Sequence, residues 1–201
     1  MHQAYRPRLN TVSKGLFIDR WGTLFETPRK GFVSSFDRVR FTPGALDALF
    51  RAGQAGWNLY LIGNEDSVAF GDLTQQKWET FERAMLAQLR RQGIAITRNY
   101  ACLENPAGQP PHNTDSVFLF PNTGTFHHAA QVDGIDLRRS WVIGDSSLEL
   151  VAGWRASCRL ASVRTGQALK DGHFPVEPEF SADCLAEALA YLSARTVSQA
   201  S

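Results

Sequence analysis

The segment from Gly15 to Leu24, GLFIDRWGTL, constrains the fold of this chain more than any other. Its apolar run ends at an acid, Asp19, and Gly22 follows three residues later. Such a run predicts a buried strand of a parallel sheet that leads directly into a loop. We therefore expect an α/β protein in which Asp19 stands at the carboxyl end of the first strand.

Strand and helix patterns alternate along the rest of the sequence. Further strands are predicted at 57–62, 94–102, 116–120, 141–143 and 159–163, and helices at 43–53, 73–91, 126–132, 148–155 and 182–194. This alternation predicts a Rossmann-like parallel sheet with helices on both faces. We expect one domain spanning 1–201 without a large cap, with loosely ordered ends at 1–13 and 196–201.

Apolar side chains recur at helical spacing in two of these helices, which indicates the faces that pack against the sheet. The first helix has Leu46, Leu49 and Phe50 on one face, and the second has Trp78, Phe81, Met85 and Leu89. We interpret both stripes as core packing.

The overall charge and the cysteines exclude several classes of function. The chain has 201 residues with 21 basic and 20 acidic side chains, a net charge of +1, so we expect neither nucleic acid nor an anionic membrane as a partner. No apolar run approaches the roughly 20 residues of a membrane span, and the first 14 residues do not resemble a signal peptide. The three cysteines, Cys102, Cys158 and Cys184, are widely spaced, which favours reduced thiols in a cytoplasmic protein.

Two acids follow apolar strands at positions where their side chains should meet. Asp19 follows the first strand and Asp145 follows the strand at 141–143. In parallel sheets ligands bind beyond the carboxyl ends of the strands. Two carboxylates at one edge repel each other unless a cation such as Mg2+ lies between them, and such a site can support phosphoryl transfer. The alternative is that each acid merely caps the turn or helix that follows it.

Asp19-Arg20-Trp21-Gly22-Thr23-Leu24 resembles the first motif of the haloacid dehalogenase superfamily, D-x-D-G-T-L. The form D-R-D-G is typical of its histidinol-phosphate and heptose-bisphosphate phosphatase subgroup. Three further segments are similar to that subgroup: 43–45, 62–71 and 134–145. The resemblance implies a Mg2+-dependent phosphatase that acts on a small phosphorylated metabolite of the sugar-phosphate type.

The resemblance also assigns roles by position. It implies that Asp19 is the nucleophile and a metal ligand, together with the backbone carbonyl of Trp21 and the carboxylate of Asp145. It further implies a phosphate contact for Gly63 and Asn64, and support of the metal ligands by Thr23 and Glu149.

Three positions depart from the family pattern. Trp21 stands where the family has a second aspartate, which protonates the leaving oxygen and then activates water. Gly63 replaces a Ser or Thr, and Phe120 falls where the subgroup has a lysine. Loss of a positioned acid/base alone costs about 10²–10⁴-fold in rate. We therefore expect weak or lost hydrolysis, unless Glu65 or Asp66 supplies an acid from another direction.

Two other functions remain open on the sequence. One is a non-catalytic binding or scaffold protein. The other is a true haloacid dehalogenase, because D-x-Y-G-T-L-F resembles Asp19–Phe25 and a leaving halide needs no general acid. Those enzymes, however, have a large cap after the first motif and require the lysine.

Two further expectations concern a zinc loop and a basic segment after the first strand. Many subgroup members carry a zinc loop, but Cys102 and His112 are too few ligands for a tetrahedral site, so we do not expect structural zinc. The segment 25–42 contains four basic residues, Arg29, Lys30, Arg38 and Arg40. It forms either a solvated basic loop or a lid that holds an anionic substrate.

Overall fold

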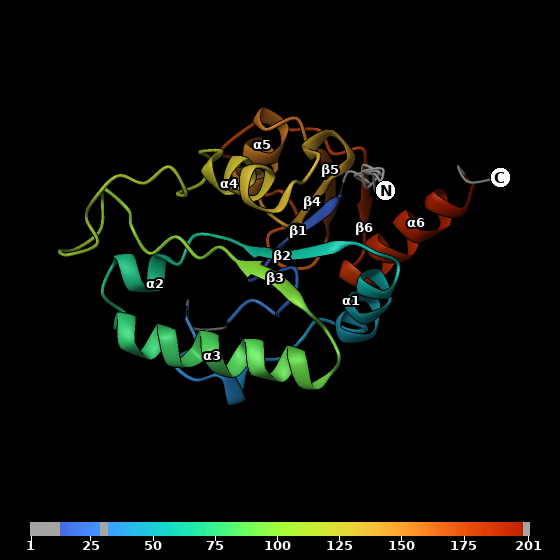
Figure 1. Ribbon diagram of the computed structural model, residues 1–201. Coiled ribbons are helices and arrows are strands. Elements are labelled where there is room, and N and C mark those ends of the chain that lie inside the picture. The colour runs from blue at the N-terminus through green and yellow to red at the C-terminus, as the bar shows by residue number, and fades with distance from the viewer. Residues whose placement is uncertain (1–12, 29–31, 199–201) are drawn as a thin grey trace, which may run out of the picture.

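The computed structural model describes residues 13–28 and 32–198 and contains one six-stranded sheet (Figure 1). The strands are β1 (Gly15–Asp19), β2 (Asn58–Ile62), β3 (Ile96–Asn99), β4 (Trp141–Gly144), β5 (Arg159–Val163) and β6 (Phe180–Ala182). They lie in the order β3-β2-β1-β4-β5-β6, and neighbouring strands pair in parallel. The predicted fold class, a parallel sheet between helices, is confirmed.

Helices cover both faces of this sheet (Figure 1). One apolar core joins the sheet to α1 (Ala45–Gln54), α3 (Gln75–Arg91) and α6 (Leu185–Ser198). The other core joins the opposite face to α4 (Gly124–Asp133) and α5 (Ser147–Arg155). Three short helices complete the fold: α2 (Asp66–Ala69), η1 (Phe36–Arg38) and η2 (Leu137–Arg139).

Strand β1 lies at the centre of the sheet, where the order of the strands reverses. The chain passes from β1 to β2 on one side, and β4 later pairs with β1 on the other side, with Ile18 opposite Ile143. Ligands of open α/β sheets bind at such a reversal, beyond the carboxyl ends of the strands. The residues that follow β1, β2 and β4 therefore meet at one edge.

The stripe predicted for α3 is confirmed, because all four of its side chains are buried: Trp78, Phe81, Met85 and Leu89. The face predicted for α1 is wrong in part. Phe50 is exposed and Leu46 is half-buried, whereas Ala45, Leu49 and Ala52 face the core. The helix begins at Ala45, and its i, i+4, i+7 positions, rather than the largest side chains, face inward.

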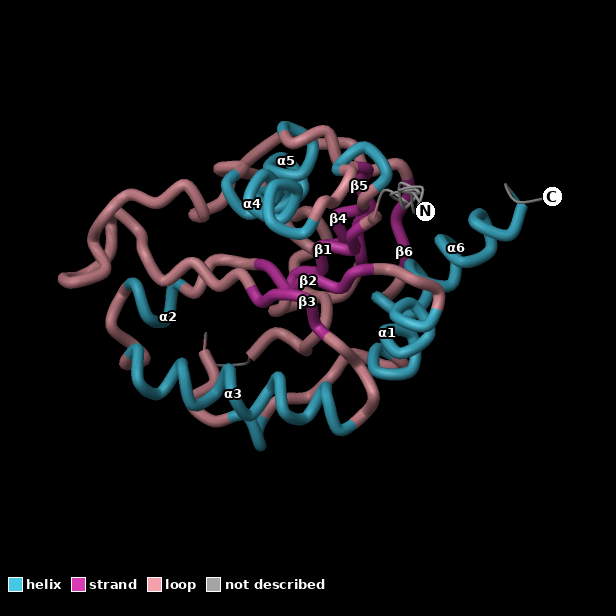
Figure 2. Tube along the Cα trace, in the orientation of Figure 1, coloured by secondary structure: helices cyan, strands magenta, loops and turns pink. Residues whose placement is uncertain are grey.

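The strand predicted at 116–120 is wrong, because this segment belongs to the long connection from β3 to α4 (Figure 2). Two of its backbone N–H groups donate hydrogen bonds to side chains instead of to a neighbouring strand. The N–H of Phe118 donates to Ser116 Oγ at 3.2 Å, and the N–H of Phe120 donates to Asn64 Oδ1 at 2.8 Å. Its apolar residues pack as a loop, with Phe120 buried against Phe126.

The remaining differences lie near the ends of the chain. Strand β6 was not predicted, and the closing helix begins at Leu185, three residues after the predicted start. The loosely ordered ends predicted at 1–13 and 196–201 fall largely outside the described residues. Within residues 13–28 and 32–198, no helix is both long and apolar enough to cross a membrane.

Candidate metal and phosphate site

Three carboxylates converge at the edge of the sheet where β1 and β4 end. Asp19 is the last residue of β1, Asp145 follows β4, and Glu149 lies in the first turn of α5. Each of the three offers an oxygen within 4.8 Å of the others. In the described part of the chain this is the one such cluster of potential metal ligands. The predicted convergence of Asp19 and Asp145 is thus observed.

Asp145 is held in place by donors from two loops. Thr23 Oγ1 donates to Asp145 Oδ1 at 3.3 Å, and the N–H of Gln167 donates to Oδ2 at 2.7 Å. Gly22 passes so close that a Cβ on it would lie 2.3 Å from Asp145 Oδ2, and its φ is +91°. The glycine of the first motif is therefore required by this close approach.

Glu149 is fixed by the N-terminus of its own helix. The N–H of Ser146 donates to Glu149 Oε1 at 2.6 Å, the hydroxyl of Ser146 contacts Oε2, and this hydroxyl also accepts from the N–H of Leu148. This reciprocal arrangement is a capping box. Because the cap immobilises Glu149, its buried carboxylate stays beside Asp19 and Asp145.

The electrostatics of the cluster favour a bound cation. Burial, followed by the charges of Glu149 and Asp145, raises the pKa of Asp19 well above its usual range. Burial also raises the pKa of Asp145, and burial together with the Asp145 charge raises the pKa of Glu149 to about 7. Three buried carboxylates cannot all ionise cheaply without a positive partner, and Mg2+ prefers oxygen ligands of this kind.

These pKa shifts predict a pH-dependent stability. Without a divalent cation, the free energy of unfolding should fall by about 3 kcal/mol as the pH rises from 4.5 to about 7. Folded Glu149 keeps its proton in this window, whereas the unfolded chain has lost it, so ionisation favours unfolding. Urea denaturation in EDTA across this pH range measures the effect. Glu149→Gln should make the fall smaller, because only the contributions of Asp19 and Asp145 then remain, and exposed Glu177→Gln should leave the fall unchanged. A stability that rises with pH would contradict the assignment.

The side chain of Trp21 packs in the wall of the site and cannot act as an acid. Its indole Nε1 donates to Glu65 Oε2 at 3.4 Å, and its ring lies 5.4 Å from the ring of Phe25 and 5.8 Å from that of Phe81. The side chain thus forms part of an aromatic cluster. An indole N–H donates hydrogen bonds but does not ionise in this role.

Gly63 and Asn64 follow β2 and face the same edge. A Cβ on Gly63 would lie 2.9 Å from Asp19 Oδ1 and 3.3 Å from Arg20 Nη2, and the φ of Gly63 is +142°. A Ser or Thr at this position would therefore be strained. Asn64 binds the backbone of Phe120 on both sides of its amide, which leaves one Nδ2 hydrogen for a ligand.

The structure separates the two acids that could have replaced the missing aspartate. Asp66 is exposed and accepts a hydrogen bond from Asn105 Nδ2 at 3.2 Å. Glu65 is only 4% exposed. Its Oε1 accepts from Ser67 Oγ at 2.6 Å, while its Oε2 accepts from the indole of Trp21. Only Glu65 is thus built into the interior.

Arg20 is a site residue that sequence reasoning missed. Its side chain is fully buried, and its guanidinium donates to the carbonyls of Gly63 and Tyr100, each at 3.0 Å. Its Nη2 lies 3.6 Å from Glu65 Oε2. The sequence around Arg20 carries no signal of this burial, because the acceptors that make it favourable come from segments more than 40 residues away.

A cavity of about 280 Å³ opens above the carboxylate cluster. The described residues that line it include the predicted site residues Asp19, Trp21, Gly63, Asn64, Asp145 and Glu149. Phe120 lines it as well, at the position where the subgroup has lysine, and stacks on Phe126 at 5.9 Å. No Lys or Arg is among the lining residues in the described part of the chain.

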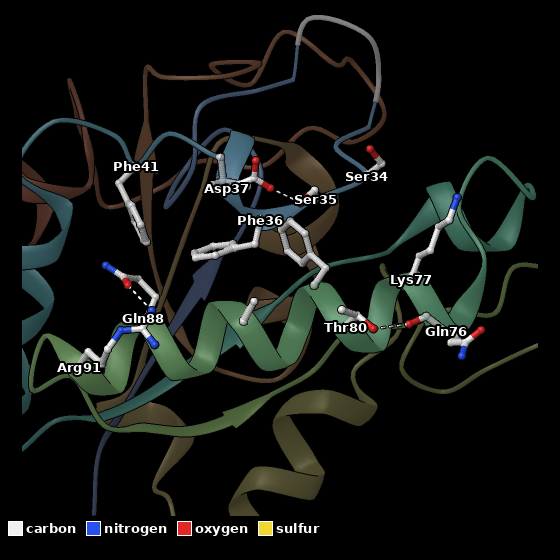
Figure 3. A pocket seen from close by; sticks show the side chains of 13 residues that line it. Ser34, Ser35, Phe36, Asp37, Phe41, Gln76, Lys77, Thr80, Gln88 and Arg91 are labelled. Atoms are coloured by element: carbon white, nitrogen blue, oxygen red, sulfur yellow. Dashed lines mark hydrogen bonds between the residues drawn. The ribbon is translucent and has the colours of Figure 1, made fainter.

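Two larger cavities flank the insertion after β1. One, of about 570 Å³, is lined by Arg38 and Arg40 and shares Trp21 and Phe32 with the carboxylate cavity. The other, of about 730 Å³, lies between η1 and α3 (Figure 3) and contains none of the clustered acids. Arg38 and Arg40 are exposed, which is compatible both with a solvated basic loop and with a lid that holds an anionic substrate. Arg29 and Lys30 lie outside the described residues.

Comparisons with known proteins point to one family. A family model described as HAD-hydrolase-like matches residues 120–188. The D-glycero-beta-D-manno-heptose-1,7-bisphosphate 7-phosphatase of Haemophilus influenzae is 28% identical over 157 residues, which cover 78% of this chain and 84% of the relative. The corresponding Escherichia coli protein is 27% identical over 179 residues, 88% of this chain and 90% of the relative.

A third relative and a solved structure extend these comparisons. The histidine biosynthesis bifunctional protein HisB of Legionella pneumophila is 27% identical over 134 residues, which cover only 36% of that longer protein. The crystal structure of a D,D-heptose 1,7-bisphosphate phosphatase from B. bronchiseptica, complexed with magnesium and phosphate, superposes with a TM-score of 0.78. Its sequence identity is 25%, and the match covers 90% of this chain and 99% of that one.

Proposed function

Because this chain belongs to the haloacid dehalogenase superfamily, we propose that it binds Mg2+ and the phosphate of a small phosphorylated metabolite, and hydrolyses that phosphate slowly. The metabolite would be of the sugar-phosphate type, as in the heptose bisphosphate phosphatases that it resembles. One observation carries the proposal: Asp19, Asp145 and Glu149 converge within 4.8 Å in a cavity at the edge of the sheet.

The residues present fit a magnesium ion. Its ligands would be the carboxylates of Asp19 and Asp145 and the backbone carbonyl of Trp21, with Thr23 and Glu149 supporting them. The raised pKa values of the three acids express the same need for a positive charge. When bound, Mg2+ draws negative charge from the phosphate oxygens.

The protein's own part of the reaction falls to Asp19. Its carboxylate oxygen attacks phosphorus, and the bond from phosphorus to the leaving oxygen breaks, which gives an aspartyl phosphate and an alkoxide that takes a proton from solvent. Water then attacks the phosphorus, so that Asp19 is regenerated and inorganic phosphate leaves. Asp19 lines the cavity, and a Cβ at position 63 would lie only 2.9 Å from its Oδ1, so the glycine leaves room for this oxygen.

Three features of the site make this hydrolysis slow. The indole of Trp21 delivers no proton to the leaving oxygen, and Gly63 has no hydroxyl to bind the phosphate. Phe120 brings no charge to the wall where a cation would balance nucleophile and phosphate. The dehalogenase alternative also requires a lysine at this position, so Phe120 weighs against it.

Titration calorimetry with inorganic phosphate, followed by phosphate-release assays on a panel of sugar phosphates, tests this proposal. Phosphate should bind when Mg2+ is present and not in EDTA, and release should be measurable but slow. Asp145→Asn should abolish the binding, whereas exposed Asp47→Asn should preserve it. Absence of Mg2+-dependent binding would refute the proposed site. Turnover like that of ordinary family members would refute slow hydrolysis, and binding without release would indicate the non-catalytic alternative.

A further inference from the structure

We infer that this cavity favours phosphate esters whose leaving group is acidic and planar, of which aryl phosphates are the simplest, and that Trp21 is the aromatic wall against which that group packs. The inference rests on the proposed metal and phosphate site, and it replaces the sugar-phosphate type suggested by the relatives with a different class of leaving group at that site. Two independent features carry it: the hydrogen-bonding partners of the acids in the cavity, and the apolar character of its walls.

The first feature is that the carboxyl groups in the cavity are committed to other partners. Asp19, Asp145 and Glu149 form the cluster. Both oxygens of Glu65 accept hydrogen bonds, from Ser67 and Trp21, and Asp66 is exposed and bound to Asn105. The described residues that line the cavity contain no carboxyl groups other than these five. An alkoxide, which needs a proton as it leaves, is poorly served here.

An acidic leaving oxygen removes this need. Asp19 forms its bond to phosphorus, and the electron pair of the breaking bond departs on the leaving oxygen. A phenolate, an enolate or a carboxylate is stable with that charge and requires no proton from the protein. Water then hydrolyses the aspartyl phosphate, and its surplus proton goes to solvent. Atoms and charge balance without a general acid.

The second feature is the wall. Trp21 is fixed from three sides, by its hydrogen bond to Glu65 and by the rings of Phe25 and Phe81. Apolar side chains from three other segments line the same cavity: Pro28, Phe32, Phe120 and Leu148. Aromatic faces held in this way favour a planar, weakly polar group over a polyhydroxylated one.

The space beyond Trp21 is large enough for such a group. Trp21, Thr27, Pro28 and Phe32 line both the carboxylate cavity of about 280 Å³ and the neighbouring cavity of about 570 Å³. A phosphate over the carboxylate cluster would therefore leave its organic part beside the indole, at the junction of the two cavities. Together they reach the volume of an ordinary small-molecule site.

Four esters separate the two features in one experiment. The leaving group of phenyl phosphate is acidic and planar, and that of cyclohexyl phosphate is an apolar ring of similar size that is neither acidic nor planar. The leaving group of acetyl phosphate is acidic without a ring, and that of glucose 6-phosphate is neither acidic nor aromatic. With Mg2+, kcat/KM for phenyl phosphate should exceed that for cyclohexyl phosphate by at least about 100-fold. Substituted phenyl phosphates should become faster as the phenol becomes more acidic.

The variant Trp21→Leu tests the wall separately. It should raise the ratio of KM for phenyl phosphate to KM for acetyl phosphate several-fold, because only the former uses the ring and any disturbance of the metal site affects both esters. Equal kcat/KM for the phenyl and cyclohexyl esters would overturn the inferred preference for an acidic leaving group. An unchanged ratio of these two KM values in the variant would overturn the assignment of Trp21 as the wall. If instead phosphate does not bind with Mg2+ and no ester is hydrolysed, the proposed function itself fails.

Discussion

Replacing Asp19 with Asn should reduce Mg2+-dependent phosphate release from every ester to the rate measured in buffer. The side chain ends β1 inside the carboxylate cavity, where it is the proposed nucleophile. An amide oxygen does not attack phosphorus, and removal of a nucleophile costs about 10⁴–10⁶-fold in rate. Phenyl phosphate gives the widest range for this measurement, since it is the substrate class on which we expect the fastest turnover.

The same variant should fold normally. Removing one of three crowded carboxylates relieves repulsion, because the charges of Glu149 and Asp145 raise the pKa of Asp19 in the native protein. The melting temperature in EDTA should therefore stay the same or increase. Asp66→Asn is the matched control, because this exposed carboxylate also borders the cavity. If Asp19→Asn retained the activity of this control, Asp19 would not be the nucleophile.

The position of the site could be predicted from the sequence because it depends on local patterns. An apolar run that ends at an acid fixes a buried strand and the edge where its side chain emerges, and this was enough to bring Asp19 beside Asp145. The buried stripe of α3 followed from its periodicity in the same way. Each of these patterns lies within a single short segment of the sequence.

Features that depend on distant partners could not be predicted in this way. An arginine is ordinarily exposed, and only the acceptors brought in by the segments after β2 and β3 make the burial of Arg20 favourable. The strand predicted at 116–120 failed for a related reason. Its composition suits a strand, but the amide of Asn64, more than fifty residues away, takes the N–H of Phe120. Strand β6 is only three residues long, too short for a clear pattern.

Replacing Trp21 with Asp should raise kcat/KM for cyclohexyl phosphate by about 10²–10⁴-fold over Trp21→Asn. The two side chains match in size, but only the carboxyl group of Asp can transfer a proton to the leaving oxygen. Position 21 lines the same cavity as the carboxylates of Asp19, Asp145 and Glu149, so the new carboxyl group would be exposed to negative charge. A neighbouring like charge favours the protonated form, which is the form that donates to a leaving alkoxide.

Both variants lose the ring that packs against Phe25 and Phe81, so each should be less stable than the native protein by about 3 kcal/mol. Assays should therefore be run well below the measured melting temperature of each. The dependence of kcat/KM on the acidity of the leaving group should become shallow in Trp21→Asp and remain steep in Trp21→Asn. Equal rates in the two variants would mean that a side chain at position 21 does not reach the leaving oxygen. The slow hydrolysis would then have to originate at Gly63 or Phe120 instead.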